Sequence, residues 1–160
     1  MNRIVLKFYF SVLFLALANI SYGQEYKIAH CYDGCPEGAS DSNHLIMRPI
    51  YALSYNTTTK SADWVAYKVS GASIGIASSL SRGAVQDNYV KDTLAVEDFL
   101  DSERVDLIRS QYVSLIDFAG TPFWSDVNYL TNNIARTLSL SQGAWYGLDW
   151  SIRNFVNRLD

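Results

Sequence analysis

Two runs of branched and aromatic residues, separated by a short polar segment, place the strongest constraint on how this chain folds. In the first run, residues 44–56, the side chains of Tyr51, Leu53 and Tyr55 occupy alternate positions, and residues 63–69 alternate in the same way. Alternation with a period of two is the pattern of a β-strand. Because residues 56–60 between the runs are polar and suited to a turn, the sequence predicts an antiparallel β-hairpin.

An apolar stripe at helical spacing lies near the end of the chain. Its members are Trp145, Leu148, Ile152, Phe155, Val156 and Leu159. Side chains spaced in this way share one face of an α-helix, and the hydroxyl of Ser139 or Ser141 is placed to cap its first turn. We therefore predict a helix over residues 145–159 that packs on the core.

The segments between the hairpin and this helix carry weaker patterns. Residues 70–83 are small and polar and predict an irregular loop. Residues 112–118 are short and apolar, which predicts a buried strand, and residues 124–130 are compatible with a short helix. Residues 97–109 alternate acidic and apolar side chains without a clear period, and we expect a helix there.

The first 23 residues have the pattern of a secretory signal. Two basic residues precede an apolar run over residues 8–18, and small residues end the segment at Gly23. The apolar run is shorter than the ~20 residues that cross a bilayer, which favours cleavage over a retained membrane anchor. We expect residues 1–23 to be removed, leaving residues 24–160 as one exported domain, secreted or periplasmic, with no membrane attachment.

The overall charge is acidic. Removing two basic residues with the signal would leave 11 of the 13 Lys and Arg residues against 16 Asp and Glu, so the formal charge of −3 would become −5. Affinity for nucleic acid comes mainly from neutralising phosphates with basic residues, so this balance argues against tight non-specific binding. Local basic residues or a bound metal can still dominate a single site.

Two cysteines, Cys31 and Cys35, lie four residues apart with a glycine and a proline nearby. In an exported chain, two cysteines at such spacing favour a single disulfide. An alternative is a zinc site that adds His30 and His44, the only two histidines of the chain, although this spacing matches no familiar zinc finger.

Six colinear motifs extend over residues 31–145, and related positions continue to about residue 158. The motifs are Cys31-Tyr-Asp-Gly-Cys35-Pro36-Glu-Gly38, Tyr51-Ala-Leu-Ser-Tyr-Asn56, Thr59-Lys60-Ser-Ala-Asp-Trp64-Val-Ala-Tyr67, Asp92-Thr-Leu-Ala95, Trp124-Ser-Asp-Val-Asn128-Tyr-Leu-Thr-Asn132 and Ser141-Gln-Gly-Ala-Trp145. Together they resemble the secreted DNA/RNA non-specific endonucleases, the Serratia-type nucleases, whose metal site carries an Asp-Arg-Gly-His signature. Residues 108–111 occupy the position of that signature and read Ile-Arg-Ser-Gln.

The resemblance implies a fold class and an activity. It implies an α+β, ββα-metal (His-Me finger) nuclease-like fold and Mg²⁺-dependent hydrolysis of phosphodiester bonds in DNA or RNA. Family members continue beyond the long helix with further strands, so we expect residues 24–160 to form a domain that is incomplete at its C-terminus. The apolar face of residues 145–159 would then lack part of its cover, which predicts self-association or a protein partner.

The resemblance also assigns roles to individual residues. It places a loop arginine at Arg82, the signature arginine at Arg109, an asparagine at Asn132 and a helix carboxylate at Asp149. The arginines would meet charge that develops on the phosphate, and the carboxylate would orient water around the metal. Read without the resemblance, Arg82 and Arg109 could simply be solvated or could pair with acidic neighbours such as Asp87 and Asp106, and Asn132 could be a cap or turn residue.

Two substitutions concern the groups that are hardest to replace. The histidine that serves the family as general base is Gln111, and the asparagine that binds magnesium is Ser141. An amide has no useful proton affinity near neutral pH, and a neutral hydroxyl is a poorer ligand than an amide carbonyl for a hard cation. We therefore expect catalysis to be impaired, magnesium binding to be doubtful and contact with DNA or RNA to be weak.

Two other functions stay open from the sequence. The chain could be an active Mg²⁺-dependent endonuclease that uses an altered base, for which His44 is a candidate only if the fold brings it to the site. It could also be a non-enzymatic protein that uses the nuclease fold to bind a partner.

Overall fold

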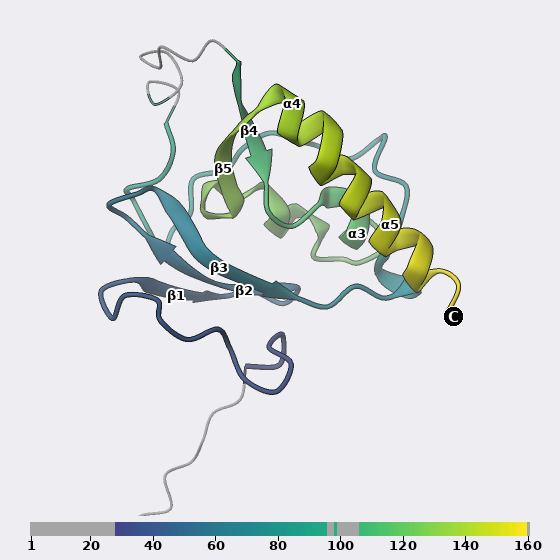
Figure 1. The fold of residues 1–160 in the computed structure, drawn as a ribbon, viewed down its shortest axis with the longest axis horizontal. Coiled ribbons are helices and arrows are strands. Elements are labelled where there is room, and N and C mark those ends of the chain that lie inside the picture. Colours follow the sequence, from purple (N-terminus) through teal and green to yellow (C-terminus); the bar gives the residue numbers. More distant parts are fainter. Residues whose placement is uncertain (1–27, 96–97, 99–105, 160) are drawn as a thin grey trace, which may run out of the picture.

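The computed structural model describes residues 28–95, residue 98 and residues 106–159. The predicted signal, residues 1–23, lies outside this part, as does most of the helix expected over residues 97–109. Figure 1 shows a three-stranded sheet, a two-stranded sheet and a long helix that runs beside the smaller sheet. Among the described residues, no helix is long and apolar enough to cross a membrane.

The predicted hairpin is confirmed. Strands β2 (Tyr51–Asn56) and β3 (Ser61–Tyr67) are antiparallel, with Leu53 opposite Val65 and an irregular register after Ser54. The expected first run is divided, because a turn closed by the Arg48 amide on the Tyr51 carbonyl separates β1 (His44–Met47) from β2. Strand β2 is therefore central, in the order β1-β2-β3, and residues 51–55 are buried.

The core lies between the larger sheet and the short helices. Side chains of β2 pack against Val113, Leu115, Phe118 and Val127. The last of these belongs to a 3-10 helix, η2 (Trp124–Asn128), so a short helix close to residues 124–130 is confirmed. The loop expected over residues 70–83 is also confirmed, with one 3-10 turn, η1 (Gly71–Ser73).

Two predictions for the middle of the chain need correction. The helix expected over residues 97–109 is wrong at its end, where strand β4 (Leu107–Gln111) pairs antiparallel with β5 (Asn133–Thr137), although residue 98 is helical. No strand forms over residues 112–118: strand β4 ends at Gln111, and helix α3 (Leu115–Phe118) follows. After Gln111 the backbone turns away from β5, because the Val113 amide donates to the side chain of Asn132 (3.0 Å) rather than to a strand.

The C-terminal helix is confirmed, with a different start. Helix α4 (Leu138–Leu140), a π-helical turn η4 (Ser141–Trp145, with an irregular backbone at Gly143) and helix α5 (Tyr146–Val156) run on from one another, after a short 3-10 turn η3 (Leu130–Asn132) and strand β5. The predicted serine caps are wrong, since the hydroxyl of Thr137 accepts the Leu140 amide at 3.3 Å.

The apolar stripe of the helix is only partly buried. Trp145, Ile152 and Val156 are half-buried, whereas Leu148, Phe155 and Leu159 are 52%, 64% and 70% exposed. The inward face is instead shared with the polar residues Ser141, Asp149 and Arg153, which line a cavity. This arrangement joins the fold to the candidate site.

The two cysteines form the predicted disulfide, with a Cα–Cα distance of 4.9 Å. Asp33 and Gly34 between them have positive φ angles of 54° and 113°, which the tight loop requires. Because the sulfurs are bonded to each other, they are not available as zinc ligands. His30 contacts the backbone carbonyl of Arg48 through Nε2 at 2.9 Å.

Candidate active site

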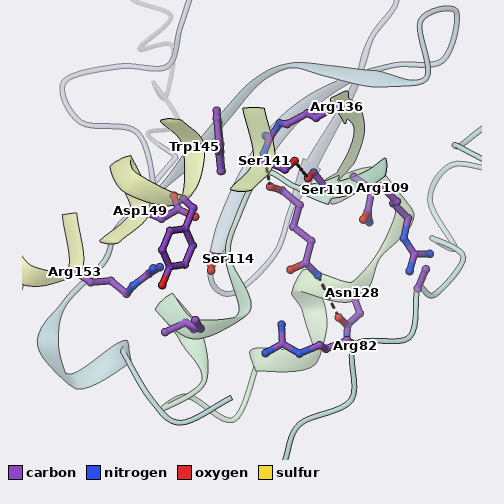
Figure 2. A pocket seen from close by; sticks show the side chains of 15 residues that line it. Arg82, Arg109, Ser110, Ser114, Asn128, Arg136, Ser141, Trp145, Asp149 and Arg153 are labelled. Carbon is purple, nitrogen blue, oxygen red and sulfur yellow. Dashed lines mark hydrogen bonds between the residues drawn. The ribbon is translucent and has the colours of Figure 1, made fainter. Parts of the chain in front are cut away.

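A cavity of about 460 Å³ lies where β4, β5 and the long helix meet (Figure 2). The residues that form it come from six separate segments of the chain. They are Arg82, Ala84, Arg109, Ser110, Gln111, Ser114, Ile116, Asn128, Asn133, Arg136, Ser141, Trp145, Tyr146, Asp149 and Arg153. The structure therefore brings together five residues that the sequence singled out, namely Arg82, Arg109, Gln111, Ser141 and Asp149.

Asn132 lies beneath the cavity rather than in its wall. Its side chain is fully buried, accepts the Val113 amide at 3.0 Å and donates to the carbonyls of Val113 (3.1 Å) and Val127 (2.9 Å). These three bonds fix the turn after β4 to the end of η2. Asn132 thus shapes the site by holding its backbone, and of the readings left open by the sequence the structure favours that of a turn residue.

Gln111 is held as a hydrogen-bond donor. Its Nε2 donates to the carbonyl of Val127 at 2.9 Å and to Oδ1 of Asn128 at 3.3 Å. Asn128 is oriented in turn by a bond from its Nδ2 to the carbonyl of Ser81 at 2.9 Å. An amide fixed in this way can orient a neighbouring polar group, but it has no lone pair that accepts a proton near neutral pH.

Ser141 is tied to the neighbouring strand. Its hydroxyl forms a hydrogen bond with the hydroxyl of Ser110 on β4, which Figure 2 shows as a dashed line. Two of the positions that differ from the family pattern, Ser110 in place of glycine and Ser141 in place of asparagine, are therefore in contact with each other. The pair joins β4 to the start of the helix.

The donors around the cavity do not fit a magnesium ion. Mg²⁺ is held by carboxylates and amide or carbonyl oxygens in octahedral geometry, whereas the wall holds a single carboxylate, Asp149, and four arginines. Among its amides, Oδ1 of Asn128 already accepts Nε2 of Gln111 at 3.3 Å. In the part of the chain that the structure describes, no group of three His, Cys, Asp or Glu residues could hold a metal. His44 lies on β1 and is not part of the cavity wall.

Electrostatics in the cavity are dominated by guanidinium groups. Arg153 is paired with the buried Asp117 at 2.9 Å, and burial raises the pKa of Asp117, an effect that Arg153 partly offsets. Burial also raises the pKa of Asp149, and Asp117 adds to the shift while Arg153 and Arg136 oppose it. The carboxylate of Asp149 is thus the one acidic group among the four arginines that line the cavity.

Arg82 and Arg109 are exposed at the rim of the cavity. The predicted alternative that Arg82 pairs with Asp87 is wrong, because Asp87 pairs with Arg48 at 2.8 Å and accepts the Thr131 hydroxyl at 2.6 Å. Neither Arg82 nor Arg109 belongs to an ion pair among the residues that the structure describes.

Arg136, like Asn128 and Arg153, lines the site but was not predicted from the sequence. It is 6% exposed, donates from Nη1 to the Gln111 carbonyl at 3.2 Å and stacks on Trp145 with 3.5 Å between the guanidinium carbon and the ring centre. Its pKa is lowered by burial, yet an arginine stays charged at any physiological pH. A single arginine in a strand carries no motif, so no sequence signal marked it.

Comparison with known proteins gives a consistent picture. No protein-family model matches the sequence. The chain is 37% identical over 138 residues to the nuclease of Serratia marcescens, a match that covers 83% of this chain and 50% of that protein. Among solved structures, a chain of the EndoG/EndoGI complex, from work on the mechanism of EndoG inhibition, superposes with a TM-score of 0.64 at 18% identity.

The EndoG/EndoGI match covers 78% of this chain and 51% of the other, so the chain spans about half the length of both proteins. The match to the EndoG chain shows the fold alone, because its sequence identity is low. Common ancestry is indicated by the sequence match to the Serratia nuclease. This chain is a homologue of the Serratia nuclease and has the ββα-metal nuclease fold.

Proposed function

We propose that this chain is an exported, nuclease-like protein that contacts DNA or RNA weakly and is impaired in hydrolysing phosphodiester bonds. The observation that carries the proposal is Gln111, which stands where the family has its general base and is held as a donor by Val127 and Asn128. Loss of a general base costs about 10²–10⁴ in rate. The homology to a protein named nuclease supports the substrate class.

The metal side of the proposal rests on Ser141. Its hydroxyl is bonded to Ser110, and the cavity wall offers one carboxylate among four arginines. If magnesium were bound, it would polarise the scissile phosphate and stabilise the leaving oxygen. The residues present supply instead fixed positive charge and donors, which suit an anion.

Export is supported by two features of different kinds. Residues 1–23 have the composition of a secretory signal. The disulfide between Cys31 and Cys35 is of the type that persists in oxidising compartments.

Restoring the family residues tests the proposed impairment. The unaltered protein, incubated with plasmid DNA or RNA and Mg²⁺, is expected to cleave no faster than a sample with chelator. A Gln111→His/Ser141→Asn variant is expected to gain at least ~10² in cleavage rate, because it regains a base and an amide ligand. The measurement is the initial rate of loss of supercoiled plasmid on gels.

The control is the same pair of changes made one at a time. Efficient, chelator-sensitive cleavage by the unaltered protein would overturn the impairment and favour an active enzyme with an altered base. A double variant as inactive as the parent would show that the two substitutions are not the cause.

A second candidate function is protein binding through the outer face of the long helix. Leu148, Phe155 and Leu159 are all more than half exposed and, at spacings of seven and four residues, lie on one side of the helix. Apolar surface gathered in this way is typical of an interaction site. We propose that this face associates with a second copy of the chain or with another protein.

Self-association predicts a concentration-dependent mass. Light scattering after size exclusion is expected to show dimers or larger species for the parent protein. Leu148→Glu/Phe155→Glu is expected to give monomers that keep the secondary structure of the parent by circular dichroism, because both side chains are exposed. The control is Asn157→Glu on the exposed end of the same helix. A parent protein that stays monomeric at every concentration would contradict self-association.

A further inference from the structure

The buried guanidinium of Arg136 has an unused donor. Its Nη1 donates to the Gln111 carbonyl at 3.2 Å, while its Nη2 has no hydrogen-bond partner and is shielded from solvent. A buried donor without a partner costs about 1–3 kcal/mol, and such groups are rare in native proteins unless ordered water, a ligand or an ion completes them. Because Arg136 lines the cavity, the group that completes it is expected to enter there.

The stacking of Arg136 decides which of its surfaces a ligand can reach. Trp145 covers a flat face of the guanidinium at 3.5 Å, and Tyr112 lies 5.5 Å from the same group. Stacking on aromatic rings leaves the N–H groups at the edge of the guanidinium available for hydrogen bonds in its plane, the arrangement that matches phosphate oxygens. A small shift of the surrounding side chains is needed to uncover Nη2, since it is screened from water in the structure.

The charge of the cavity has the opposite sign to that of the chain. The whole sequence has a formal charge of −3, yet the cavity wall holds four arginines and one aspartate. Asp117 neutralises Arg153, and Asp149 offsets one further charge. The remaining excess of positive charge in a concave, partly buried place concentrates anions there.

We propose that Arg136 takes the place of a divalent cation, so that the cavity binds a phosphate group of a nucleic acid without a metal. This inference rests on the proposed contact with DNA or RNA and adds the group that makes it. Arg136 would contact the phosphate from the buried part of the cavity wall, and the exposed Arg82 and Arg109 would contact it from the solvent side. A fixed guanidinium neutralises the phosphate but supplies no activated water, which agrees with a binding site that has lost hydrolysis.

Binding of a fluorescein-labelled single-stranded oligonucleotide, followed by anisotropy at fixed ionic strength, tests this inference. The full chain is expected to bind equally well with EDTA and with Mg²⁺. Arg136→Met is expected to weaken binding about 10–100-fold, the range for hydrogen bonds to a charged group. Arg136→Lys is expected to recover part of the loss, because it keeps the charge and not the fork of donors.

The matched control is Arg158→Met, which removes one positive charge beyond the end of α5, outside the cavity. It is expected to change the affinity less than about twofold, since an exposed charge at a distance is largely screened. Melting temperatures of all variants separate lost binding from lost folding. If Arg136→Met does not fold, titration of the isotopically labelled parent with inorganic phosphate in EDTA is expected to shift the Arg136 guanidinium resonance.

The outcomes separate this inference from the proposed function. Binding that requires Mg²⁺ would overturn the replacement of the metal and leave nucleic-acid contact in place. Equal binding by the parent and a folded Arg136→Met, or an unmoved Arg136 resonance, would overturn the role of Arg136. No binding of any oligonucleotide under either condition would contradict the nucleic-acid contact on which the inference rests.

Discussion

Asp117→Ala is expected to lower the free energy of unfolding by about 3–5 kcal/mol, because it leaves the guanidinium of Arg153 buried without its partner. Asp117 is 2% exposed and Arg153 is 9% exposed, and Arg153 Nη1 lies 2.9 Å from Asp117 Oδ1. The pair joins α3 to α5 across the edge of the cavity. Equilibrium unfolding in urea, monitored by tryptophan fluorescence, measures the loss.

Removing both partners separates the cost of leaving one buried charge unpaired from the contribution of the ion pair itself. Asp117→Leu/Arg153→Met is expected to recover most of the stability, because well-packed apolar residues often replace a buried ion pair at little cost. The matched control is Asp98→Ala, which breaks the more exposed Lys60–Asp98 pair and is expected to cost less than about 1 kcal/mol. If Asp117→Ala costs as little stability as Asp98→Ala, then apolar packing, rather than the Asp117–Arg153 pair, holds the long helix in place.

The parts of the fold that follow from local patterns were predictable from the sequence. Alternation over residues 51–55 and 63–67 identified the hairpin, and helical spacing identified α5. The conformation of residues 112–118 was not predictable from their composition, because a short apolar run indicates burial and does not distinguish a strand from a helix. Their conformation depends on Asn132, which lies 19 residues from Val113 in the sequence. The side chain of Asn132 accepts the Val113 amide, which is then not available to pair with a strand.

The wall of the site was predictable only where a motif marked it. Gln111, Ser141 and Asp149 were found by their places in a family pattern, and the structure brings them to one cavity. Arg136 was missed, since its importance comes from Trp145 stacking on it and from a donor left without a partner. Both are properties of tertiary packing that no spacing of residues encodes.

The apolar stripe of the C-terminal helix also shows what spacing alone does not predict. Its spacing indicated a helix correctly, but it did not indicate which members are covered. Polar Ser141, Asp149 and Arg153 take the inward positions because they line a cavity, and this turns Leu148 and Phe155 toward solvent. The cavity is thus an exception to the usual rule that the apolar face of a surface helix packs on the core.

Asn132→Leu is expected to destabilise the fold by about 3 kcal/mol or more. The change keeps the volume of the side chain similar and removes the partners of three backbone groups, the Val113 amide, the Val113 carbonyl and the Val127 carbonyl. Each buried polar group left without a partner costs roughly 1–3 kcal/mol. Asn157→Leu, on the exposed end of the long helix, serves as the control and is expected to change stability by less than about 0.5 kcal/mol.

The same variant decides between the two roles that the sequence left open for Asn132. If Asn132 only positions the backbone, the Asn132→Leu protein, measured at a low temperature at which it is folded, binds the oligonucleotide about as tightly as the parent. Its melting temperature is then lower than that of the parent. If instead it keeps the parent's melting temperature and loses binding, Asn132 belongs to the wall of the site, as the family resemblance implied. The first result is expected, because the side chain is fully buried and all three of its hydrogen bonds go to backbone groups.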